Sequence, residues 1–230
     1  MPATSILRVL LAAALSFCAN LPARAQTQVD VLLVLAVDTS GSVSDARFEL
    51  QKQGYAAAFR NPNVLRAIRS GMNQSIAVTM TQWTGPSLQA QVVPWTLLTD
   101  QTSVLAFADA IEKAPRELFS GGTSISGAID HAMLLLPSAP FKGNKHVIDI
   151  SGDGSNNRGR SVMQARDDAV SAGVVINGLP ILSLEPWLDK YYFDQVIGGL
   201  GSFMILAESY EKFADAVLRK LVLEIALNTR

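Results

Sequence analysis

Runs of consecutive apolar residues alternate along this chain with longer segments in which apolar residues recur every three or four positions. Val31 to Val37 is such a run, rich in Val and Leu, and it is typical of a central parallel strand that is buried on both faces. Asp38 ends this run, and Gly41 marks a tight turn after it. Further strands are predicted over Ile76 to Trp83, Lys145 to Ile150, Val174 to Leu179 and Phe203 to Ala207.

The helical segments are bounded by residues that favour helix ends. Ser44 is a good N-cap and is followed by Asp45, which suits the positive end of a helix. Asn61-Pro62 is expected to stop this helix after about Arg60. The same periodicity predicts helices over Thr99 to Glu112, from Thr123 or Ser124 to about Leu136, over Ser161 to Ala172, over Trp187 to Ile197 and over Tyr210 to Leu227.

One segment is predicted to lie at the edge of the sheet. Gln89 to Trp95 alternates and contains Pro94, which a central strand would not tolerate. A turn at Thr84-Gly85-Pro86-Ser87 joins it to the preceding strand as an antiparallel pair. The alternation of strands and helices predicts a doubly wound α/β domain with helices on both faces of the sheet. We expect six mostly parallel strands in the order 3-2-1-4-5-6, of which strand 3 is antiparallel.

The first residues have the pattern of a secretory signal peptide. An apolar run from Val9 to Ala19 follows a weakly cationic start, and Ala23-Arg24-Ala25 offers small residues for cleavage after Ala25. The run is shorter than the ~20 residues that a membrane anchor needs, and Phe17 stands before Cys18 where a lipoprotein site would have a small residue. We therefore expect residues 1–25 to be a signal peptide and residues 26–230 to form one domain. The mature protein is expected to be periplasmic or secreted, with no membrane span.

Composition narrows the classes of function. The 230 residues include 19 basic and 20 acidic side chains, and loss of Arg8 and Arg24 with the signal leaves 17 basic ones. This balance, without a basic patch, gives no indication of nucleic-acid binding. Cys18 is the only cysteine, so the mature chain has no disulfide and depends on its core for stability.

Three short segments carry the candidate chemistry. Asp38, Ser40 and Ser42 follow the first buried strand, Thr123 opens a helical pattern, and Asp153 follows the strand that ends at Ile150. The carboxyl ends of parallel strands meet at one edge of a sheet, where such folds bind ligands. Three hydroxyls and two carboxylates are suitable ligands for a hard divalent cation. The sequence therefore predicts a site for Mg2+, with Mn2+ and Ca2+ as alternatives.

Each of these motifs has a simpler interpretation when it is taken alone. Serine near a turn is commonly a cap, and Thr123 at the start of a helix can be one as well. Asp153 lies between two glycines and can be a turn residue. The order of the motifs and their position at strand ends favour the combined interpretation.

Two catalytic alternatives are weaker. The segment from Gly152 to Asn157 faintly resembles the acidic loop of haloacid-dehalogenase-type phosphatases, in which Asp38 would be the nucleophile. That chemistry needs a second Asp as general acid where Ser40 stands. A serine hydrolase would need Gly-x-Ser-x-Gly, which the sequence lacks. His131, expected on an exposed helix face, and His146, expected at a strand edge, have no place in a catalytic triad. We therefore expect no enzymatic activity.

The five candidate ligands resemble the metal-ion-dependent adhesion site of the von Willebrand factor type A family, and the chain from about Gln28 to Leu227 is similar to such a domain. The closest similarity is to a group of small secreted bacterial proteins catalogued only as a domain of unknown function. The resemblance implies that the two serine hydroxyls bind the metal directly, Thr123 directly or through water, and the two aspartates mostly through water. It implies a binding module whose cation captures an exposed Asp or Glu of a protein partner. A structural domain whose metal site has lapsed is the remaining alternative.

The residues around these motifs are assigned to packing and loop structure. Trp83, Trp95 and Trp187 are expected in the core or at the rim of the sheet, and a partner could contact Trp83 or Trp187. Arg158 and Arg160 flank the Asp153 loop and are expected to be solvated, although they could attract an acidic partner.

Overall fold

The computed structural model describes residues 26–228. Five strands form one sheet in the order β3-β2-β1-β4-β5. Strand β3 is antiparallel to β2, while β1, β2, β4 and β5 are mutually parallel, as predicted. The strands are β1 (Thr27–Asp38), β2 (Ile76–Trp83), β3 (Gln89–Leu98), β4 (Phe141–Gly152) and β5 (Val174–Pro180).

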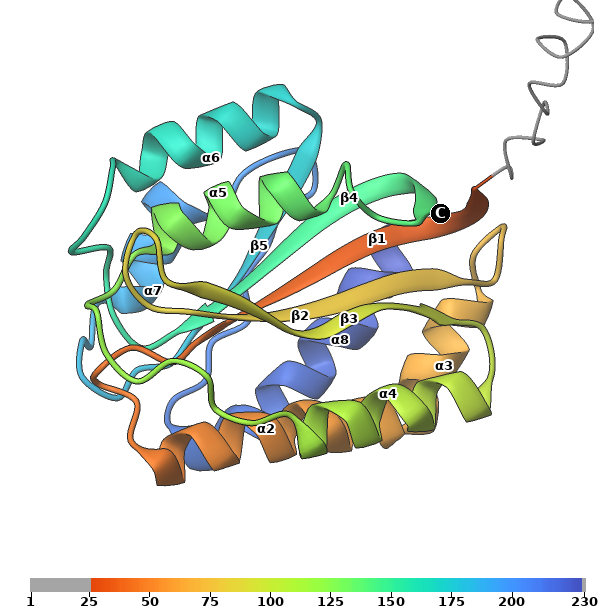
Figure 1. The fold of residues 1–230 in the computed structure, drawn as a ribbon, viewed down its shortest axis with the longest axis horizontal. Coiled ribbons are helices and arrows are strands. Elements are labelled where there is room, and N and C mark those ends of the chain that lie inside the picture. Colours follow the sequence, from red (N-terminus) through yellow and green to blue (C-terminus); the bar gives the residue numbers. More distant parts are fainter. Residues whose placement is uncertain (1–25, 229–230) are drawn as a thin grey trace, which may run out of the picture.

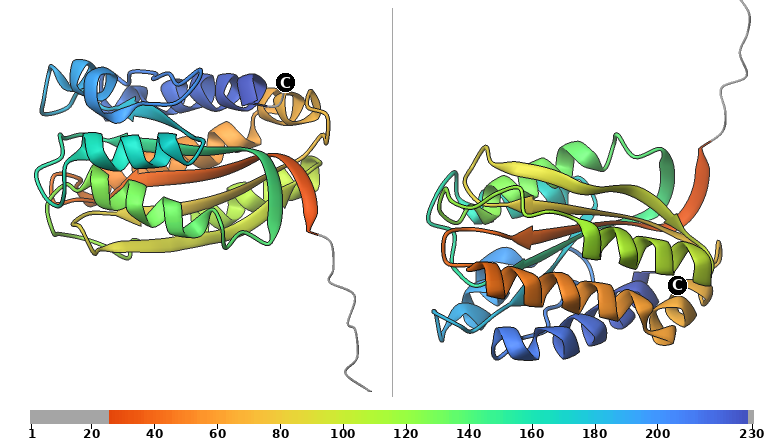
Figure 2. Two further views of the ribbon diagram at one scale, coloured as in Figure 1. Left: turned by 90° about the horizontal axis from the view of Figure 1, so that it is seen from above. Right: turned by 60° about the horizontal axis from the view of Figure 1, so that its bottom comes forward.

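Helices cover both faces of this sheet (Figure 1). One face carries α2 (Asp45–Arg60), α3 (Pro62–Arg69), α4 (Gln101–Lys113) and α8 (Phe213–Asn228). The other face carries α5 (Ile125–Leu135), α6 (Val162–Ser171), α7 (Leu188–Tyr191) and a π-helical turn (Tyr192–Val196). Figure 2 shows the two helical layers on opposite sides of the strands.

The central strand β1 is buried on both faces, which is why it reads as a continuous apolar run. Its side chains alternate between two cores, with Leu33 and Leu35 in the layer of α2, α4 and α8, and Leu32 and Val34 in the layer of α5 and α6. Within residues 26–228, no helix is long and apolar enough to cross a membrane.

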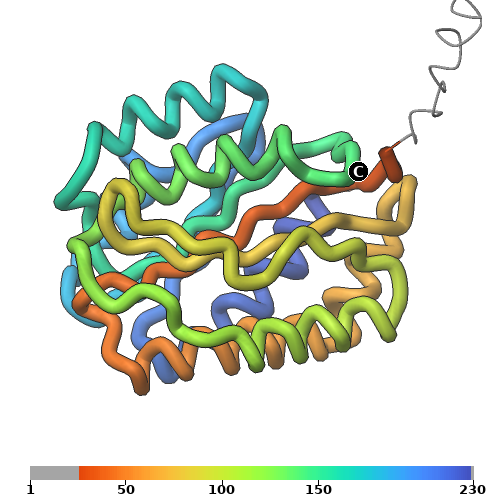
Figure 3. Tube along the Cα trace, in the orientation of Figure 1, coloured from red at the N-terminus to blue at the C-terminus, as the bar shows by residue number. Residues whose placement is uncertain are grey.

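The sheet register brings the predicted site segments to one edge. Asp38 pairs with Trp83 on β2, and Val37 pairs with Ser151 on β4. The β1 and β4 strands therefore end side by side. Their loops meet the loop before α5 at the left end of the molecule in Figure 3.

The predicted sixth strand is not formed as a continuous strand. Residues 203–207 run beside β5, but they pair with it only through isolated parallel bridges at Gly178 and Ile181. Gly178 N donates to Phe203 O, and Ala207 N donates to Pro180 O. Between these bonds β5 would have to donate from residue 180, and proline has no N–H. The ladder is therefore interrupted at Pro180, which lies on the edge strand of the sheet.

Two helix predictions also need correction. Asn61-Pro62 ends α2, but the same residues begin α3, because Asn61 caps the backbone N–H of Asn63 and Pro62 occupies the first helical position. The helix expected over Trp187 to Ile197 is instead a short α7 followed by the π-helical turn. The predicted signal peptide lies outside the described residues.

Candidate metal centre

The first part of the site is the loop that leaves β1 at Asp38. The Ser40 backbone N–H donates to Asp38 Oδ1 over 2.7 Å, and Val43 N donates to Ser40 O over 3.0 Å. The chain therefore turns tightly after Asp38, and this turn leaves Ser40 buried and Ser42 half-buried. Gln51 on α2 is buried, and its Nε2 donates to the Asp38 carbonyl over 3.0 Å. These bonds fix the carboxylate and the loop relative to α2.

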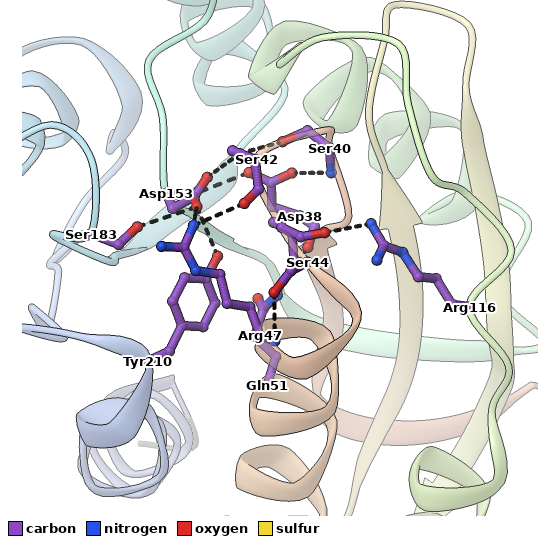
Figure 4. A network of polar contacts seen from close by, with 11 residues as sticks. Asp38, Ser40, Ser42, Ser44, Arg47, Gln51, Arg116, Asp153, Ser183 and Tyr210 are labelled. Atoms are coloured by element: carbon purple, nitrogen blue, oxygen red, sulfur yellow. Dashed lines mark hydrogen bonds and ion pairs between the residues drawn. The ribbon is translucent and has the colours of Figure 1, made fainter.

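Arg116 holds the outer side of the same loop. Its Nη2 donates to Thr39 O over 3.1 Å and to Val43 O over 2.7 Å, and its Nη1 contacts Asp45 at 2.8 Å. The Arg116 side chain is only 10% exposed, and these bonds hold the loop in place. Figure 4 shows Arg116 reaching the loop from the side opposite to Asp153.

The two serine hydroxyls of this loop lie side by side. Ser40 Oγ and Ser42 Oγ are 3.1 Å apart, and Ser42 Oγ donates to Asp153 Oδ1 over 2.6 Å (Figure 4). Because the Ser42 proton is directed at the carboxylate, its lone pairs are available to another electrophile. The hydrogen bond thus joins the loops after β1 and β4 and orients one candidate ligand.

Asp153 is a buried acceptor with many donors. Its Oδ2 accepts from Ser183 Oγ at 3.2 Å and from Tyr210 Oη at 3.0 Å, and Arg47 Nη1 lies 3.6 Å away. Burial and the adjacent carboxylate raise the pKa of Tyr210 well above its ordinary value, so its hydroxyl remains a donor. Because its oxygens already have these donors, Asp153 is suited to orient Ser42 and a metal-bound water rather than to bind a metal directly.

Gly152 allows the two carboxylates to approach each other. A Cβ at this position would lie 3.0 Å from Asp38 Oδ2, 3.0 Å from Tyr192 Oη and 3.2 Å from Trp83 Cζ2. The backbone N–H of Asp153 points at Asp38 Oδ2 over 3.4 Å. A side chain at this position would therefore press on the Asp38 carboxylate.

Thr123 approaches the site from a third loop. Asn157 binds its backbone twice, since Asn157 Oδ1 accepts from Thr123 N at 3.0 Å and Asn157 N donates to Thr123 O at 2.9 Å. Its Oγ1 lies 3.6 Å from the position that a Cβ on Gly154 would take. Among the described residues, Thr123 makes no side-chain hydrogen bond to the other four candidate ligands. The structure therefore joins Asp38, Ser40, Ser42 and Asp153 in one network and places Thr123 beside it.

The charges of the site favour a cation. Burial raises the pKa of Asp38 to about 7, and the charge of Asp153 contributes to the shift. Two buried carboxylates therefore face each other with Arg47 as the cation nearest to Asp153. A divalent ion beside them would relieve their repulsion.

The donor set fits a hard cation of the Mg2+ type. Hydroxyl and carboxylate oxygens are its preferred ligands, and it commonly retains several waters. Within residues 26–228, no group of three or more His, Cys, Asp or Glu side chains is arranged to hold a metal. Any cation at this site would therefore depend on the hydroxyls of Ser40, Ser42 and Thr123.

Sequence reasoning missed the three side chains around Asp153, which are Arg47, Ser183 and Tyr210, and also Gln51 and Arg116, which hold the loop after Asp38. Ser183 carried a usable signal, because it follows β5 at the same sheet edge as the other strand-end residues. The positions of Arg47 and Tyr210 depend on how α2 and the 3-10 helix (Tyr210–Lys212) pack, and the sequence gives no local sign of this.

The other singled-out residues lie in varied positions. Trp83 is fully buried, Trp95 is half-buried and Trp187 is 54% exposed, so a partner can reach Trp187 and not Trp83. His131 is half-buried rather than exposed, and His146 lies on β4, an interior strand, rather than at the sheet edge.

The two flanking arginines differ in their contacts. Arg160 forms ion pairs with Asp130 and Asp168, each at 2.6 Å. These bonds raise the pKa of its guanidinium above its usual value, and its charge is already paired. Arg158 is exposed and forms no ion pair with any of the described residues.

Solved structures with the same fold include a byssus protein and two pilus proteins. Proximal thread matrix protein 1 from the mussel byssus is 16% identical with a TM-score of 0.63, and the match covers 87% of this chain and 46% of that one. The pilus adhesin SpaC from Lactobacillus rhamnosus GG is 17% identical with a TM-score of 0.61, covering 87% of this chain and 31% of that one. The vWF domain of the pilus tip protein Mfa5 from Porphyromonas gingivalis is 10% identical with a TM-score of 0.60, covering 88% and 97%.

These similarities define the fold as that of a von Willebrand factor type A domain. One of the byssus protein structures has a zinc-occupied MIDAS motif, at 15% identity and a TM-score of 0.61. Our chain spans less than half of the byssus protein and about a third of SpaC.

The family itself follows from a sequence model. The model described as "Protein of unknown function (DUF1194)" matches residues 28–229, so the chain belongs to this family. No curated protein matches the sequence.

Proposed function

We propose that this protein is a secreted, metal-dependent protein-binding module. The observation that carries the proposal is the network at the ends of β1 and β4, in which Ser42 is held by Asp153 and lies beside Ser40. Adhesins and pilins among the proteins with this fold support a role in protein–protein contact.

The proposed ligands are Ser40, Ser42 and Thr123, with Asp38 and Asp153 acting through hydrogen bonds and water. When bound, a divalent cation held by neutral hydroxyls supplies an electrophilic centre for an anion. Mg2+ is the proposed ion, with Mn2+ and Ca2+ as alternatives, because all three prefer oxygen ligands. The proposed partner is a protein that presents an Asp or Glu carboxylate.

The charge balance at the site supports an anionic partner. Asp38 and Asp153 contribute at most two negative charges and Arg47 one positive charge, so a divalent cation leaves the site with a net positive charge. Exposed apolar side chains on the surrounding loops, Leu184 and Trp187, offer area for a protein surface next to this charge.

We assign the protein no catalytic activity. A carboxylate nucleophile needs an accessible, ionised oxygen. Asp38 is fully buried, and its pKa is raised to about 7. Export to the periplasm or the cell exterior is part of the proposal, and it rests on the amino-terminal sequence pattern and on the pilus and byssus proteins that share the fold.

The test combines metal binding with partner capture. Calorimetric titration with Mg2+ or Mn2+ should give binding by the wild type and none by Ser40→Ala, whereas Ser120→Ala should match the wild type. Ser120 is an exposed serine in the loop before Thr123 and controls for the loss of a hydroxyl.

The same three proteins are then used in a pull-down from the native envelope fraction, with Mg2+ and with a chelator. A partner that is retained with Mg2+ and lost with the chelator or with Ser40→Ala supports the proposal. Equal metal binding by the wild type and Ser40→Ala contradicts the assignment of the site, and capture that survives chelation contradicts the metal-dependent mechanism.

A further inference from the structure

Arg47 is the side chain whose position at the site is least explained by holding the fold together. It lies in the first turn of α2, where Ser44 caps its backbone N–H. Its Nη1 donates to Ser42 O over 2.9 Å, so the guanidinium lies directly beside one of the proposed metal ligands. Its Cζ lies 5.1 Å from the centre of the Tyr210 ring, which supports the planar group from one side. The side chain is thus pre-positioned at the rim of the site (Figure 4).

The contact with Asp153 does not account for this arrangement. Arg47 Nη1 is 3.6 Å from Asp153 Oδ2, which is too far for a hydrogen bond. The same oxygen already accepts from Ser183 and Tyr210. Asp153 is therefore satisfied without a direct hydrogen bond from Arg47.

Part of the Arg47 guanidinium remains available. Within residues 26–228, Nε and Nη2 have no hydrogen-bond partner, and the side chain is 33% exposed. Arg116, on the other side of the same loop, is 10% exposed and its guanidinium nitrogens are occupied. Only one of these two arginines is thus able to receive a ligand from solvent.

A planar anion with two oxygens fits these two centres. One carboxylate oxygen can complete the coordination of a cation held by Ser40 and Ser42, and the second can accept from a free N–H of Arg47. Guanidinium and carboxylate groups are matched in shape and charge, and such charge-assisted bonds are stronger than neutral ones. Chloride is a single atom, so it can bind the metal or Arg47 but cannot bridge the two.

We propose that Arg47 is a second anion-binding group of the site, which holds the free oxygen of a carboxylate whose other oxygen binds the metal. The inference rests on the metal site proposed above and identifies the residue that favours a carboxylate over a monatomic anion. Arg47 belongs to the binding surface in this proposal and is not a metal ligand.

The experiment measures the coupling between metal and carboxylate. Mn2+ is titrated into the full chain by calorimetry in sodium acetate and, at equal ionic strength, in sodium chloride. If acetate bridges the metal and Arg47, it must tighten Mn2+ binding by the same factor by which Mn2+ tightens acetate binding. We expect a ratio of apparent affinities of about fivefold or more for the wild type, a typical size for such coupling.

The variants decide which residue carries this ratio. Arg47→Gln should bring the ratio close to one while Mn2+ still binds, and Arg47→Lys, which keeps the charge but not the fork of donors, should give an intermediate ratio. Arg158→Gln is the matched control, because it removes an exposed arginine from a neighbouring loop, and it should keep the wild-type ratio.

The possible failures are distinct. A wild-type protein that binds no Mn2+ refutes the proposed function itself. Mn2+ binding with equal affinity in acetate and chloride leaves the metal site intact and refutes the role of Arg47. A wild-type ratio in Arg47→Gln, or an equal loss of the ratio in Arg158→Gln, also refutes it.

Discussion

Replacement of Asp38 by asparagine should stabilise the metal-free protein and abolish its response to a divalent cation. Asp38 is fully buried at the end of β1, and the charge of the nearby Asp153 opposes its ionisation. In the absence of a cation, the folded chain therefore bears the cost of burying one carboxylate beside another. Asparagine has nearly the same shape and carries no charge.

The size of the effect follows from the perturbation of Asp38. Its pKa rises from 3.8 to about 7 on folding. At 1.36 kcal/mol per unit, the ionised side chain costs about 4 kcal/mol of stability at a pH well above 7. Asparagine avoids this cost of about 4 kcal/mol, but it introduces another. Asp38 Oδ2 now accepts from the backbone N–H of Asp153, and the amide NH2 of asparagine at that position would place two donors against each other. An unpaired buried donor costs about 1–3 kcal/mol, so we expect a net stabilisation of about 2 kcal/mol.

Thermal unfolding in a chelator at a pH above 8 measures this directly. For a chain of this length, about 2 kcal/mol corresponds to an increase in Tm of roughly 4–8 °C. Addition of Mg2+ should then raise the Tm of the wild type and leave that of the Asp38→Asn variant unchanged, since a ligand stabilises only the state that binds it. A variant that is less stable than the wild type in chelator would refute the argument from buried charge. A variant still stabilised by Mg2+ would refute the role of Asp38 in the site.

Two further predictions concern Gly152, beside Asp38, and Glu224, in the core under α8. Gly152→Ala should lower stability by about 1–3 kcal/mol and reduce the Mg2+-induced rise in Tm, because its Cβ would lie 3.0 Å from Asp38 Oδ2. Gly41→Ala, which meets nothing within 4 Å, should leave the free energy of unfolding nearly unchanged, and an equal loss in both variants would contradict the steric explanation. Glu224→Gln should remove a loss of stability that develops in the wild type between about pH 4.5 and 7. Burial raises the pKa of Glu224 from 4.5 to about 7, so the folded protein holds a proton that the unfolded chain has released, and stability falls as the pH rises through this window. Urea unfolding of both proteins at several pH values measures this, and a difference in stability that does not vary with pH would refute it.

The Glu224 prediction concerns a buried polar cluster that the sequence did not indicate. Lys220 Nζ lies 2.6 Å from Asp149 Oδ1 and 3.1 Å from Glu224 Oε1, and Asn177 Nδ2 donates to Glu224 over 2.7 Å. All four side chains are fully buried between the sheet and α8. Glu224→Gln keeps the oxygen that accepts from Asn177 and Lys220, and it leaves one acid opposite one base. Charged residues four apart on a helix normally indicate a solvated face, so the pattern itself gave no sign of burial.

The parts of the fold that the sequence predicted are those determined by one segment at a time. The strand β1 was found because seven consecutive apolar residues rich in Val and Leu are typical of a strand that is buried on both faces of a sheet. The prediction of a sixth continuous strand was wrong. The apolar run at residues 203–207 gives no information about β5, on which Pro180 has no N–H to donate to the ladder. The helix α3 was missed because Pro62 was interpreted as a stop, although Val64, Ala67 and Ile68 have helical spacing just after it.

The residues of the candidate site also fall into those that one segment determines and those that depend on packing. Asp38 and Asp153 could be located because each follows a strand, and the topology of a parallel sheet brings strand ends together. Arg47, Ser183 and Tyr210 surround the Asp153 carboxylate from three other segments, and only the packing of α2 and the loops determines which of their side chains reach it. An arginine in the first turn of a helix can lie beside the candidate site or in solvent. Nothing local in the sequence distinguishes the two cases.

The hydrogen bonds from Ser183 and Tyr210 to Asp153 change the chemistry that the five predicted ligands alone would suggest. A carboxylate with free oxygens would bind a cation directly and neutralise part of its charge, which would favour metal storage over partner capture. Asp153 has donors on both oxygens, from Ser42 on one and from Ser183 and Tyr210 on the other. Its negative charge is thereby fixed behind the proposed hydroxyl ligands, where it would stabilise a cation without occupying its coordination sphere. A cation held in this way would retain an open position and most of its charge, with the free donors of Arg47 beside it. Retention of a partner would therefore require both an oxygen for the metal and an oxygen for the guanidinium.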